Sequence, residues 1–560
     1  MFKNRPTKKK KAGIGCLFVL LILIISGWLL SLRLHITPPA VQDIHRLTKK
    51  EITIAETGER VFNGCFLRKS DSGLWEMYLS GSAFDRGVAA GKLGKELLRY
   101  QEDVFIDQIK KLIPSEFYLK FLRIFIAVFN RNLAADIPDE WKEEIYGISL
   151  SCTHEYDYIG TPYERQLNYH AAHDLGHALQ DYRLVGCTSF AAWSGATDDS
   201  TLIIGRNFDF YVGDDFAKNK TVIFYAPETG YNFISVCWAG MVGVLSGMNE
   251  KGLTVTINAA KSSIPIASAT PVSIVCREIL QYASTLEEAK QIAGKRKLFV
   301  SESILVGSAI DNSAIIIEKS PEKEGVCQPS GNWIVCANHF QSETFQNDER
   351  NLNNIRTSDS PYRQQRMEEL IRRNLPLNPG KAAEILRNKA GLSDEKIGLG
   401  NQKSINQLIA HHSVIFKPKQ KQVWISTAPW QLGEYVCYDL NKIFTDPIFS
   451  KEIKSESLTI AADTFLNTNE YKEFLFYRDY RQKLKAIIQK KESANEEDID
   501  RFIRSNINLY SVYELVGDYY ASKKQTDRAI VFWKNALEKE IPTLPEKGAI
   551  QKKIPSRIGH

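Results

Sequence analysis

The stretch around Cys187 constrains the fold of this chain more than any other. An apolar run follows the cysteine, a turn rich in Gly, Asp and Ser spans 194–200, and a second apolar run at 201–205 leads into Arg206 and Asp209. Two apolar runs joined by a turn of this composition predict a β-hairpin. The hairpin would carry Cys187 at its start and the other two residues at its end. We therefore expect the three side chains to lie close together.

A cysteine beside a guanidinium and a carboxylate has the surroundings of a covalent nucleophile. A neighbouring cation lowers the pKa of a thiol, and a carboxylate can orient the reacting group. The alternative is a buried cysteine in a core strand, because free cysteine is among the most buried residue types. The hairpin alone leaves both roles open for Cys187.

Further short blocks follow the hairpin in a fixed order. They are 247–253, Asn258, 337–340, 359–367, and 412–416 with Trp424. Together with the two ends of the hairpin, 186–189 and 206–210, these blocks resemble the acyl-CoA:6-aminopenicillanate acyltransferase family, also called peptidase family C45. This family is related to the choloylglycine hydrolases among the N-terminal-nucleophile (Ntn) hydrolases. Ordered blocks between residues 75 and 440 are far more specific than any single one.

The resemblance implies an α+β fold for residues 187–445, the four-layer αββα sandwich of Ntn hydrolases. Residues 75–186 then correspond to the propeptide, which becomes the small fragment. The apolar runs after the hairpin agree with this, because they read as strands, then helices, then strands again. We expect strands at 222–225, 233–238, 253–258, 298–311, 313–318, 414–425 and 433–439, and helices at 271–280 and 285–292.

The resemblance also implies that the chain cuts itself between Gly186 and Cys187. The sulfur of Cys187 would attack the carbonyl of Gly186, where a glycine leaves the backbone free to adopt a strained conformation. Hydrolysis of the thioester would make Cys187 an N-terminal residue. Its α-amino group, with an ordinary pKa near 8, is a base beside its own thiol. Such a nucleophile forms an S-acyl enzyme with its substrate. Neither a metal nor a cofactor is implied.

The other site residues take their roles from the same resemblance. Asp209 would hold the α-amino group, and Asn338 would donate a hydrogen bond to the oxyanion. Asn258 matches a substrate-binding position, and Arg206 matches the arginine of the choloylglycine hydrolases. The acyltransferases carry one more arginine shortly before their late strand. This chain has Gln407 there instead, and an amide offers neither the charge nor the planar fork of a guanidinium.

Three functions are compatible with these residues. The main hypothesis is an autoproteolytic amidohydrolase that cleaves linear carbon–nitrogen bonds of small N-acyl compounds. An acyltransferase that moves an acyl group from a thioester to an amine is the alternative, which the missing arginine disfavours. The third is a catalytically inactive, membrane-tethered interaction protein. The complete set of Cys187, Asp209 and Asn338 argues against that third function.

The beginning of the chain is basic and then apolar. Residues 1–12 hold six Lys and Arg and no acid, so they account for the whole formal charge of +6. A body without net charge has no electrostatic footprint for nucleic acid. Residues 13–32 are uncharged and rich in Leu and Ile, which is typical of a membrane-spanning helix. No A-x-A-like site follows, so we expect a single-pass signal anchor rather than a cleaved signal, with the catalytic part on the extracytoplasmic side.

The regions that flank the catalytic part are expected to be simpler. Residues 33–74 are mixed and polar, and we predict a linker with a short strand at 51–55. Apolar residues at helical spacing over 105–130 predict helices that pack on the catalytic domain and keep the two fragments together as a heterodimer. Residues 446–560 predict a helical tail with one tetratricopeptide-like (TPR-like) hairpin. Because one repeat cannot bury its own face, this tail should pack on the domain or cap it.

Two further groups of residues have a chemical and a structural interpretation. His170, His173 and His177 could share one helix face and hold zinc, but we favour a polar helix flank. The chain has nine cysteines, and a pairing of Cys65 with Cys152 stays open because sequence alone cannot assign it.

Overall fold

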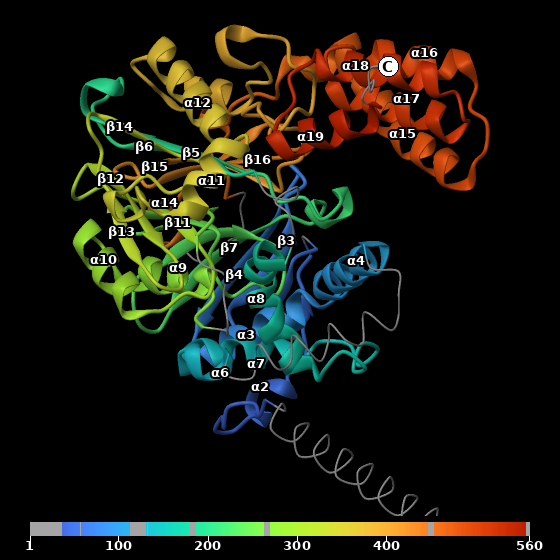
Figure 1. The fold of residues 1–560 in the computed structure, drawn as a ribbon. Helices are drawn as coiled ribbons and strands as arrows, with labels where there is room; N and C mark the ends of the chain where they lie inside the picture. The colour runs from blue at the N-terminus through green and yellow to red at the C-terminus, as the bar shows by residue number, and fades with distance from the viewer. Residues whose placement is uncertain are drawn as a thin grey trace, which may run out of the picture.

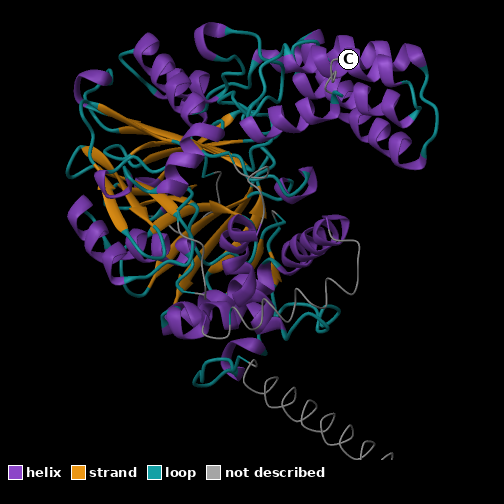
Figure 2. Ribbon diagram, viewed as in Figure 1, coloured by secondary structure: helices purple, strands orange, loops and turns teal. Residues whose placement is uncertain are grey.

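The computed structural model describes residues 36–56, 58–112, 130, 133–179, 186–262, 269–445 and 453–555. Two β-sheets lie face to face, and helices cover the outer face of each sheet (Figure 1). A bundle of helices from the end of the chain lies beside this sandwich, as the purple elements of Figure 2 show.

The larger sheet combines strands from both sides of Cys187. Strand β4 pairs in parallel with β7, from Trp75 opposite Thr221 to Gly81 opposite Pro227. This junction joins the four strands before the cysteine to the seven after it. In order of pairing the strands are β1 (Thr53–Ile54), β2 (Arg60–Phe62), β3 (Cys65–Lys69), β4 (Trp75–Gly81), β7 (Thr221–Pro227), β8 (Phe233–Cys237), β9 (Ser246–Asn249), β10 (Leu253–Ala259), β11 (Glu302–Ser308), β12 (Ser313–Lys319) and β13 (Glu324–Cys327).

The smaller sheet contains the predicted hairpin. Strands β5 and β6 pair antiparallel, with Thr188 opposite Asn207, which confirms the hairpin. Every neighbouring pair in this sheet is antiparallel. In order of pairing the strands are β14 (Trp333–Cys336), β5 (Thr188–Ala192), β6 (Ile203–Phe208), β15 (His412–Lys417), β16 (Gln422–Ser426) and β17 (Tyr435–Asp439).

Three apolar cores separate the four layers. One lies between the sheets and includes Phe224 and Val414. A second lies between the smaller sheet and its helices and includes Phe190 and Leu370. The third lies between the larger sheet and its helices. The αββα order is therefore confirmed. The helices are α2 (His45–Thr48), α3 (Ala83–Leu93), α4 (Lys95–Leu112), α6 (Leu133–Asp136), α7 (Asp139–Ser149), α8 (Pro162–Leu179), α9 (Val272–Tyr282), α10 (Leu286–Lys295), α11 (Glu349–Thr357), α12 (Ser360–Asn374), α13 (Pro379–Leu386) and α14 (Leu440–Ile443).

The linker predicted for residues 33–74 needs a correction. Strands β1, β2 and β3 lie within it and form one edge of the larger sheet. Phe62 and Leu67 from these strands are buried in the core against the helices. Short apolar runs between polar residues hid this contribution, because a strand of two to five residues leaves little periodicity to detect.

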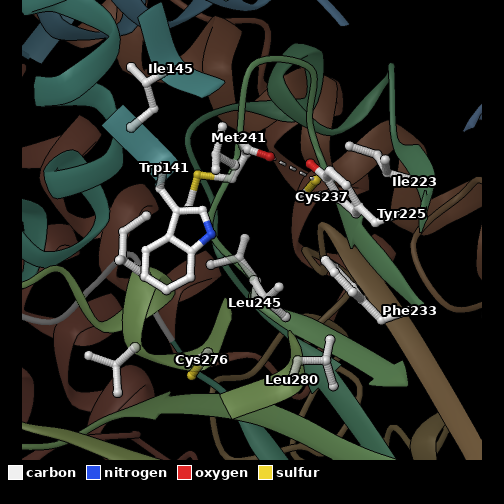
Figure 3. Packing of buried hydrophobic residues seen from close by; sticks show 14 of the residues in the cluster. Trp141, Ile145, Ile223, Tyr225, Phe233, Cys237, Met241, Leu245, Cys276 and Leu280 are labelled. Atoms are coloured by element: carbon white, nitrogen blue, oxygen red, sulfur yellow. Dashed lines mark hydrogen bonds between the residues drawn. The ribbon is translucent and has the colours of Figure 1, made fainter. Parts of the chain in front are cut away.

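The core behind the larger sheet is built from both sides of Cys187. Figure 3 shows Trp141 and Ile145 of α7 packed with Met241 and Leu245, which follow β8. Burying a large apolar side chain contributes about 1.5–3 kcal/mol. The residues before and after the cysteine therefore share one hydrophobic core and fold as one unit.

A buried ion cluster also joins these two parts. Glu144 of α7 accepts hydrogen bonds at its Oε2 atom from Arg86 Nη2 at 2.7 Å and from Arg277 Nη2 at 3.2 Å. All three side chains are at most 1% exposed. Arg86 and Glu144 lie before Cys187, whereas Arg277 lies in α9 after it. One carboxylate thus neutralises guanidinium groups from both sides of the predicted cut.

The C-terminal helices form a small core of their own that continues onto the sandwich. Helices α17 and α18 form a helical hairpin, as predicted, while its likeness to a TPR repeat stays a prediction. Gly517 faces Trp533 so closely that a Cβ would lie 2.5 Å from the indole. Leu399, Leu408 and Leu432 of the sandwich belong to the same core. The expectation that the tail packs on the domain is confirmed. The tail helices are α15 (Asn469–Lys490), α16 (Glu496–Ser505), α17 (Tyr510–Ser522), α18 (Thr526–Leu537) and α19 (Leu544–Lys553).

Two predictions concern segments that the structure does not describe. The anchor at 13–32 lies outside the described residues, and of the helix predicted over 105–130 only the part within α4 is described. In the part of the chain that is described, we find no helix with the length and apolar character needed to span a membrane.

Glu144→Ala should destabilise the protein by about 3–5 kcal/mol, because it leaves two buried guanidinium groups without their carboxylate. Chemical denaturation followed by circular dichroism measures this change. Glu143→Ala on the same helix is the control, because Glu143 is only partly buried. Equal losses for the two variants would contradict the role of the cluster.

Candidate active site

The pairing of β5 with β6 places the predicted site residues side by side. The backbone N–H of Gly186 donates to the carbonyl of Asp209 at 3.0 Å, which extends the ladder beyond the strands. Cys187, the next residue, is 1% exposed. Arg206 Nη2 donates to its Sγ atom at 3.8 Å. The cysteine, the arginine and the aspartate therefore lie close together, as the sequence predicted.

Arg206 is held mainly by uncharged groups. Its guanidinium donates to the carbonyls of Leu245, at 3.2 Å, and of Ile257. It also lies 3.3 Å from Nε2 of His412 and over the ring of Phe208, with 4.2 Å to the ring centroid. Burial lowers the pKa of Arg206 from its ordinary value. These contacts fix the guanidinium against the sulfur.

The thiol of Cys187 is a weak acid in the intact chain. Burial raises its pKa to about 11, and the negative charges of Asp209 and Glu302 act in the same direction. Arg206 and Arg363 lower the pKa, but burial outweighs them. The predicted effect of the neighbouring cation on the thiol pKa is therefore present, but the thiol still favours its neutral form because it lies in an apolar site. The sulfur needs a base before it can attack.

Asp209 is a buried carboxyl group whose two oxygens accept no hydrogen bond among the described residues. Burial raises its pKa to about 8, although Arg363 and Arg206 both act to lower it. A buried carboxylate without a partner is costly, and native structures normally supply one. Arg363 and Arg206 act on Asp209 through their charges alone, since among the described residues neither donates a hydrogen bond to it.

Strand β14 and Arg363 together position Asn338 at the site. Neither was singled out from the sequence. Strand β14 pairs with β5, with Cys336 opposite Ser189, so Asn338 follows two residues later. Arg363 Nη2 donates to Oδ1 of Asn338 at 2.8 Å, and Nδ2 of Asn338 donates to the carbonyl of Ala259 at 2.8 Å. These two bonds fix the direction of the Asn338 amide.

Arg363 also holds the nucleophile's own backbone. Its Nη1 atom donates to the carbonyl of Cys187 at 2.8 Å and to Oγ1 of Thr188 at 2.7 Å. The residue is 1% exposed and lies in α12. It belongs to the block 359–367 that carried the family resemblance, which was the one signal that could have identified it.

Asn258 lies close to the site but uses its amide internally. Its Oδ1 atom accepts from Oγ of Ser189 at 2.8 Å, and its Nδ2 atom donates to the carbonyls of Cys336 at 3.0 Å and Ala337 at 3.2 Å. Asn258 thereby ties β10 to β5 and to the residues just before Asn338. Its substrate-binding role stays a prediction.

Gln407, the residue that departs from the acyltransferase pattern, contacts the predicted cleavage point. Its Nε2 atom donates to the carbonyl oxygen of Gly186 at 3.2 Å. The side chain is 3% exposed. Sequence comparison presented this residue only as a missing arginine, so its contact with Gly186 could not be anticipated.

The structure describes part of the predicted histidine cluster and eight of the nine cysteines. His170 uses both ring nitrogens, with Nδ1 at 2.7 Å from the carbonyl of Gln166 and Nε2 accepting from the backbone N–H of Val242 at 2.8 Å, so it has no lone pair for zinc. The side chains of His173 and His177 are outside the described residues. Where the structure describes the chain, no cluster of metal-ligating residues occurs and each cysteine, Cys65 and Cys152 included, is a free thiol.

An aromatic pocket lies beside the site. Its wall includes Phe210, which stacks on Phe208 with 5.5 Å between ring centroids and follows Asp209 directly. Helices α4 and α8 contribute the other side, so residues from before and after Cys187 line the same pocket. The aromatic side chains that line it are Phe105, Tyr169, Phe210, Phe216 and Trp238.

A family model described as acyl-coenzyme A:6-aminopenicillanic acid acyl-transferase matches residues 196–429. The family resemblance is confirmed. The match covers less than half of the chain and begins after Cys187. This match supports amide hydrolysis or acyl transfer as the type of reaction.

Other similarities are more distant. An uncharacterized protein of Archaeoglobus fulgidus is 25% identical over 289 residues, which is 49% of this chain and 48% of that protein. The chain thus spans about half the length of this relative. A Caenorhabditis elegans N-acylethanolamine-hydrolyzing acid amidase ortholog is 19% identical, with 42% of this chain and 93% of that chain covered and a TM-score of 0.30. A mutant of the conjugated bile acid hydrolase from Clostridium perfringens is 15% identical, with 48% and 96% covered and a TM-score of 0.32. Both TM-scores are low.

Asp209 should make the uncut chain less stable as the pH rises. The folded chain keeps a proton on Asp209 up to about pH 8, whereas the unfolded chain releases it near the ordinary pKa of about 4. Between these values the folded state binds more protons, so each increase in pH favours unfolding. Denaturation of Cys187→Ala and of Cys187→Ala with Asp209→Asn at several pH values measures this. The stability difference between them should change steadily from about pH 5 to about pH 8; a constant difference would contradict the raised pKa.

Proposed function

We propose that this protein is an autoproteolytic cysteine amidohydrolase whose mature nucleophile is the N-terminal Cys187. Asp209 is the observation that supports it best. A buried carboxyl group without a hydrogen-bond partner among the described residues lies across the ladder from the Gly186–Cys187 bond. Cleavage of that bond creates an α-amino group, which can carry a positive charge. The carboxylate would then gain a charged hydrogen-bond donor, which it lacks among the described residues of the uncut chain.

The proposed turnover uses groups already near Cys187. The α-amino group accepts the thiol proton, and the sulfur attacks the amide carbonyl of a small N-acyl substrate. Asn338, whose amide direction is fixed by Arg363, donates to the oxyanion. The amine leaves with a proton, and water releases the acyl group from the S-acyl enzyme. Arg206 stabilises negative charge on the sulfur.

Hydrolysis is favoured over acyl transfer to an amine because of Gln407. The transferases have an arginine near this position, whereas this chain has an amide that binds its own Gly186 carbonyl. Acyl transfer stays the second candidate, since both reactions pass through the same S-acyl enzyme. A catalytically inactive interaction protein would not need a buried carboxyl group and two buried arginines around one thiol, because each of these groups is costly to bury.

The aromatic pocket supports an apolar acyl group in the substrate. Ligand pockets are largely apolar, with a few polar groups that fix the orientation of the ligand. This pocket is lined by Phe210, which directly follows Asp209 in the chain. Its walls come from both fragments, so the proposed heterodimer of the two would be the active form. Residues 13–32 would tether this heterodimer to a membrane through its small fragment, with the site on the extracytoplasmic side.

Purified wild-type protein should hydrolyse N-acyl amino acids, and longer or aromatic acyl groups should lower KM because they fill the aromatic pocket. Release of the free amine from a panel of such compounds measures this. Cys187→Ala is the control and should release none. Adding a second amine tests transfer: a new amide product at high amine concentration would favour the acyltransferase instead. If Cys187→Ala were as active as the wild type, both the hydrolase and the acyltransferase reaction through Cys187 would be contradicted.

The wild-type chain should separate into two bands on a denaturing gel, with about one third and two thirds of the full mass, and the larger should begin at Cys187. The shared core and the pairing of β4 with β7 should keep both in one particle under native conditions. N-terminal sequencing and size-exclusion chromatography check these points. Cys187→Ala should stay one band. A wild-type enzyme that is active but uncut would remove self-cleavage.

A further inference from the structure

Three hydrogen bonds hold the backbone at and on both sides of the peptide bond between Gly186 and Cys187. The N–H of Gly186 donates to the carbonyl of Asp209 at 3.0 Å, and the carbonyl of Cys187 accepts from Arg363 at 2.8 Å. The third contact is on the carbonyl that would be attacked, because Gln407 Nε2 donates to the oxygen of Gly186 at 3.2 Å. These hydrogen bonds thus fix three consecutive peptide groups, and the middle one contains the bond that would be cut.

We propose that Gln407 is a catalytic residue of self-cleavage, in which its side-chain amide stabilises the oxyanion that forms on the Gly186 carbonyl. The inference rests on the proposed function, since it assigns a role within that cleavage. A donor that already points at the oxygen needs no rearrangement when negative charge develops, and the bond is stronger away from water. Gln407 meets both conditions because it is 3% exposed.

Gly186 makes this approach possible. A Cβ at this position would lie 2.4 Å from Nε2 and 3.1 Å from Cδ of Gln407, and the first of these distances is shorter than real contacts of a Cβ atom. A larger residue would therefore push the amide away from the carbonyl. The glycine before the nucleophile and the glutamine in place of an arginine are two parts of one arrangement.

Gln407 is also held rigidly from both sides. Asn406 donates through its backbone N–H to the carbonyl of Asn388 at 2.8 Å. The backbone N–H of Leu408 donates to Oδ1 of Asn406 at 2.9 Å, and the Leu408 side chain is buried in the core of the tail helices. Such support makes the amide a preorganised donor rather than a mobile one.

The proposed cleavage passes through an oxyanion and a thioester. The Sγ atom bonds to the Gly186 carbon while its proton passes to Asp209 in its carboxylate form, which the folded chain reaches as the pH approaches about 8. The carbonyl electron pair moves to the oxygen held by Gln407. The oxyanion then collapses, the bond from carbon to the Cys187 nitrogen breaks, and the proton from Asp209 moves to that nitrogen. One water hydrolyses the thioester, which restores the thiol and leaves a carboxylate on Gly186.

The test follows cleavage of the full-length chain made by cell-free synthesis in detergent micelles, as a pulse followed by a chase. Gln407→Met keeps the length of the side chain without its donor, and we expect cleavage to slow about 10²–10³-fold, as for loss of an oxyanion donor. Gln431→Met is the matched control, because Gln431 is equally buried and should tolerate the change. Thermal unfolding shows that each variant folds.

Gln407→Glu gives a readout that a purely structural role would not. An ionised carboxylate cannot donate, whereas a protonated carboxyl group can. The wild-type cleavage rate divided by the variant rate should therefore decrease as the pH falls. Wild-type rates for folded Gln407→Met, or a ratio that does not change with pH, would overturn the role of Gln407 alone. An uncut wild type, or a Cys187→Ala chain that is still cut, would overturn the proposed function as well.

Discussion

The register between β5 and β6 is the constraint on which the site depends. With Thr188 opposite Asn207, the side chain of Arg206 lies on the face between the two sheets, toward the sulfur of Cys187. Successive residues of a strand point to opposite faces, so a slip of one residue would send Arg206 into the core against α12 and α13. The apolar residues of both faces specify the register, and the site depends on the sandwich core for its geometry.

Burial has two opposite consequences around Cys187. It strengthens the hydrogen bonds and charges that surround the thiol, because the local dielectric is low. It also keeps the thiol protonated and raises the pKa of Asp209, so the uncut chain holds groups that are poorly matched to one another. A new α-amino group would supply the base and the counterion together. Low polarity around the thiol therefore disfavours the charged forms of Cys187 and Asp209 in the uncut chain. It would strengthen the pairing of Asp209 with the α-amino group that the proposed cleavage creates.

Sequence patterns predicted local structure and nearby contacts well, and distant contacts less well. The hairpin that joins Cys187 to Arg206 and Asp209 was predictable because its two strands and turn are adjacent in the chain. The positions of Asn338 and Arg363 depend on β14 and α12, which lie more than 140 residues after Cys187. No periodicity in the sequence specifies that these two elements contact the hairpin. Resemblance indicated the role of Asn338, yet Gln407 looked like a loss until its contact with Gly186 was seen.

The contact between the tail helices and the loop before β15 links the site to the order in which the chain is made. Asn506 of the tail exchanges two hydrogen bonds with the backbone of Leu399, and Asn401 donates to the carbonyl of Glu540. Leu399 and Asn401 lie at the start of the loop that carries Gln407, and their tail partners are translated after the rest of the site. A ribosome-bound chain that has reached only β17 therefore has all the strands of the sandwich but not the support for that loop. We expect maturation to wait until the last helices have emerged, so an incomplete chain would not cut itself early.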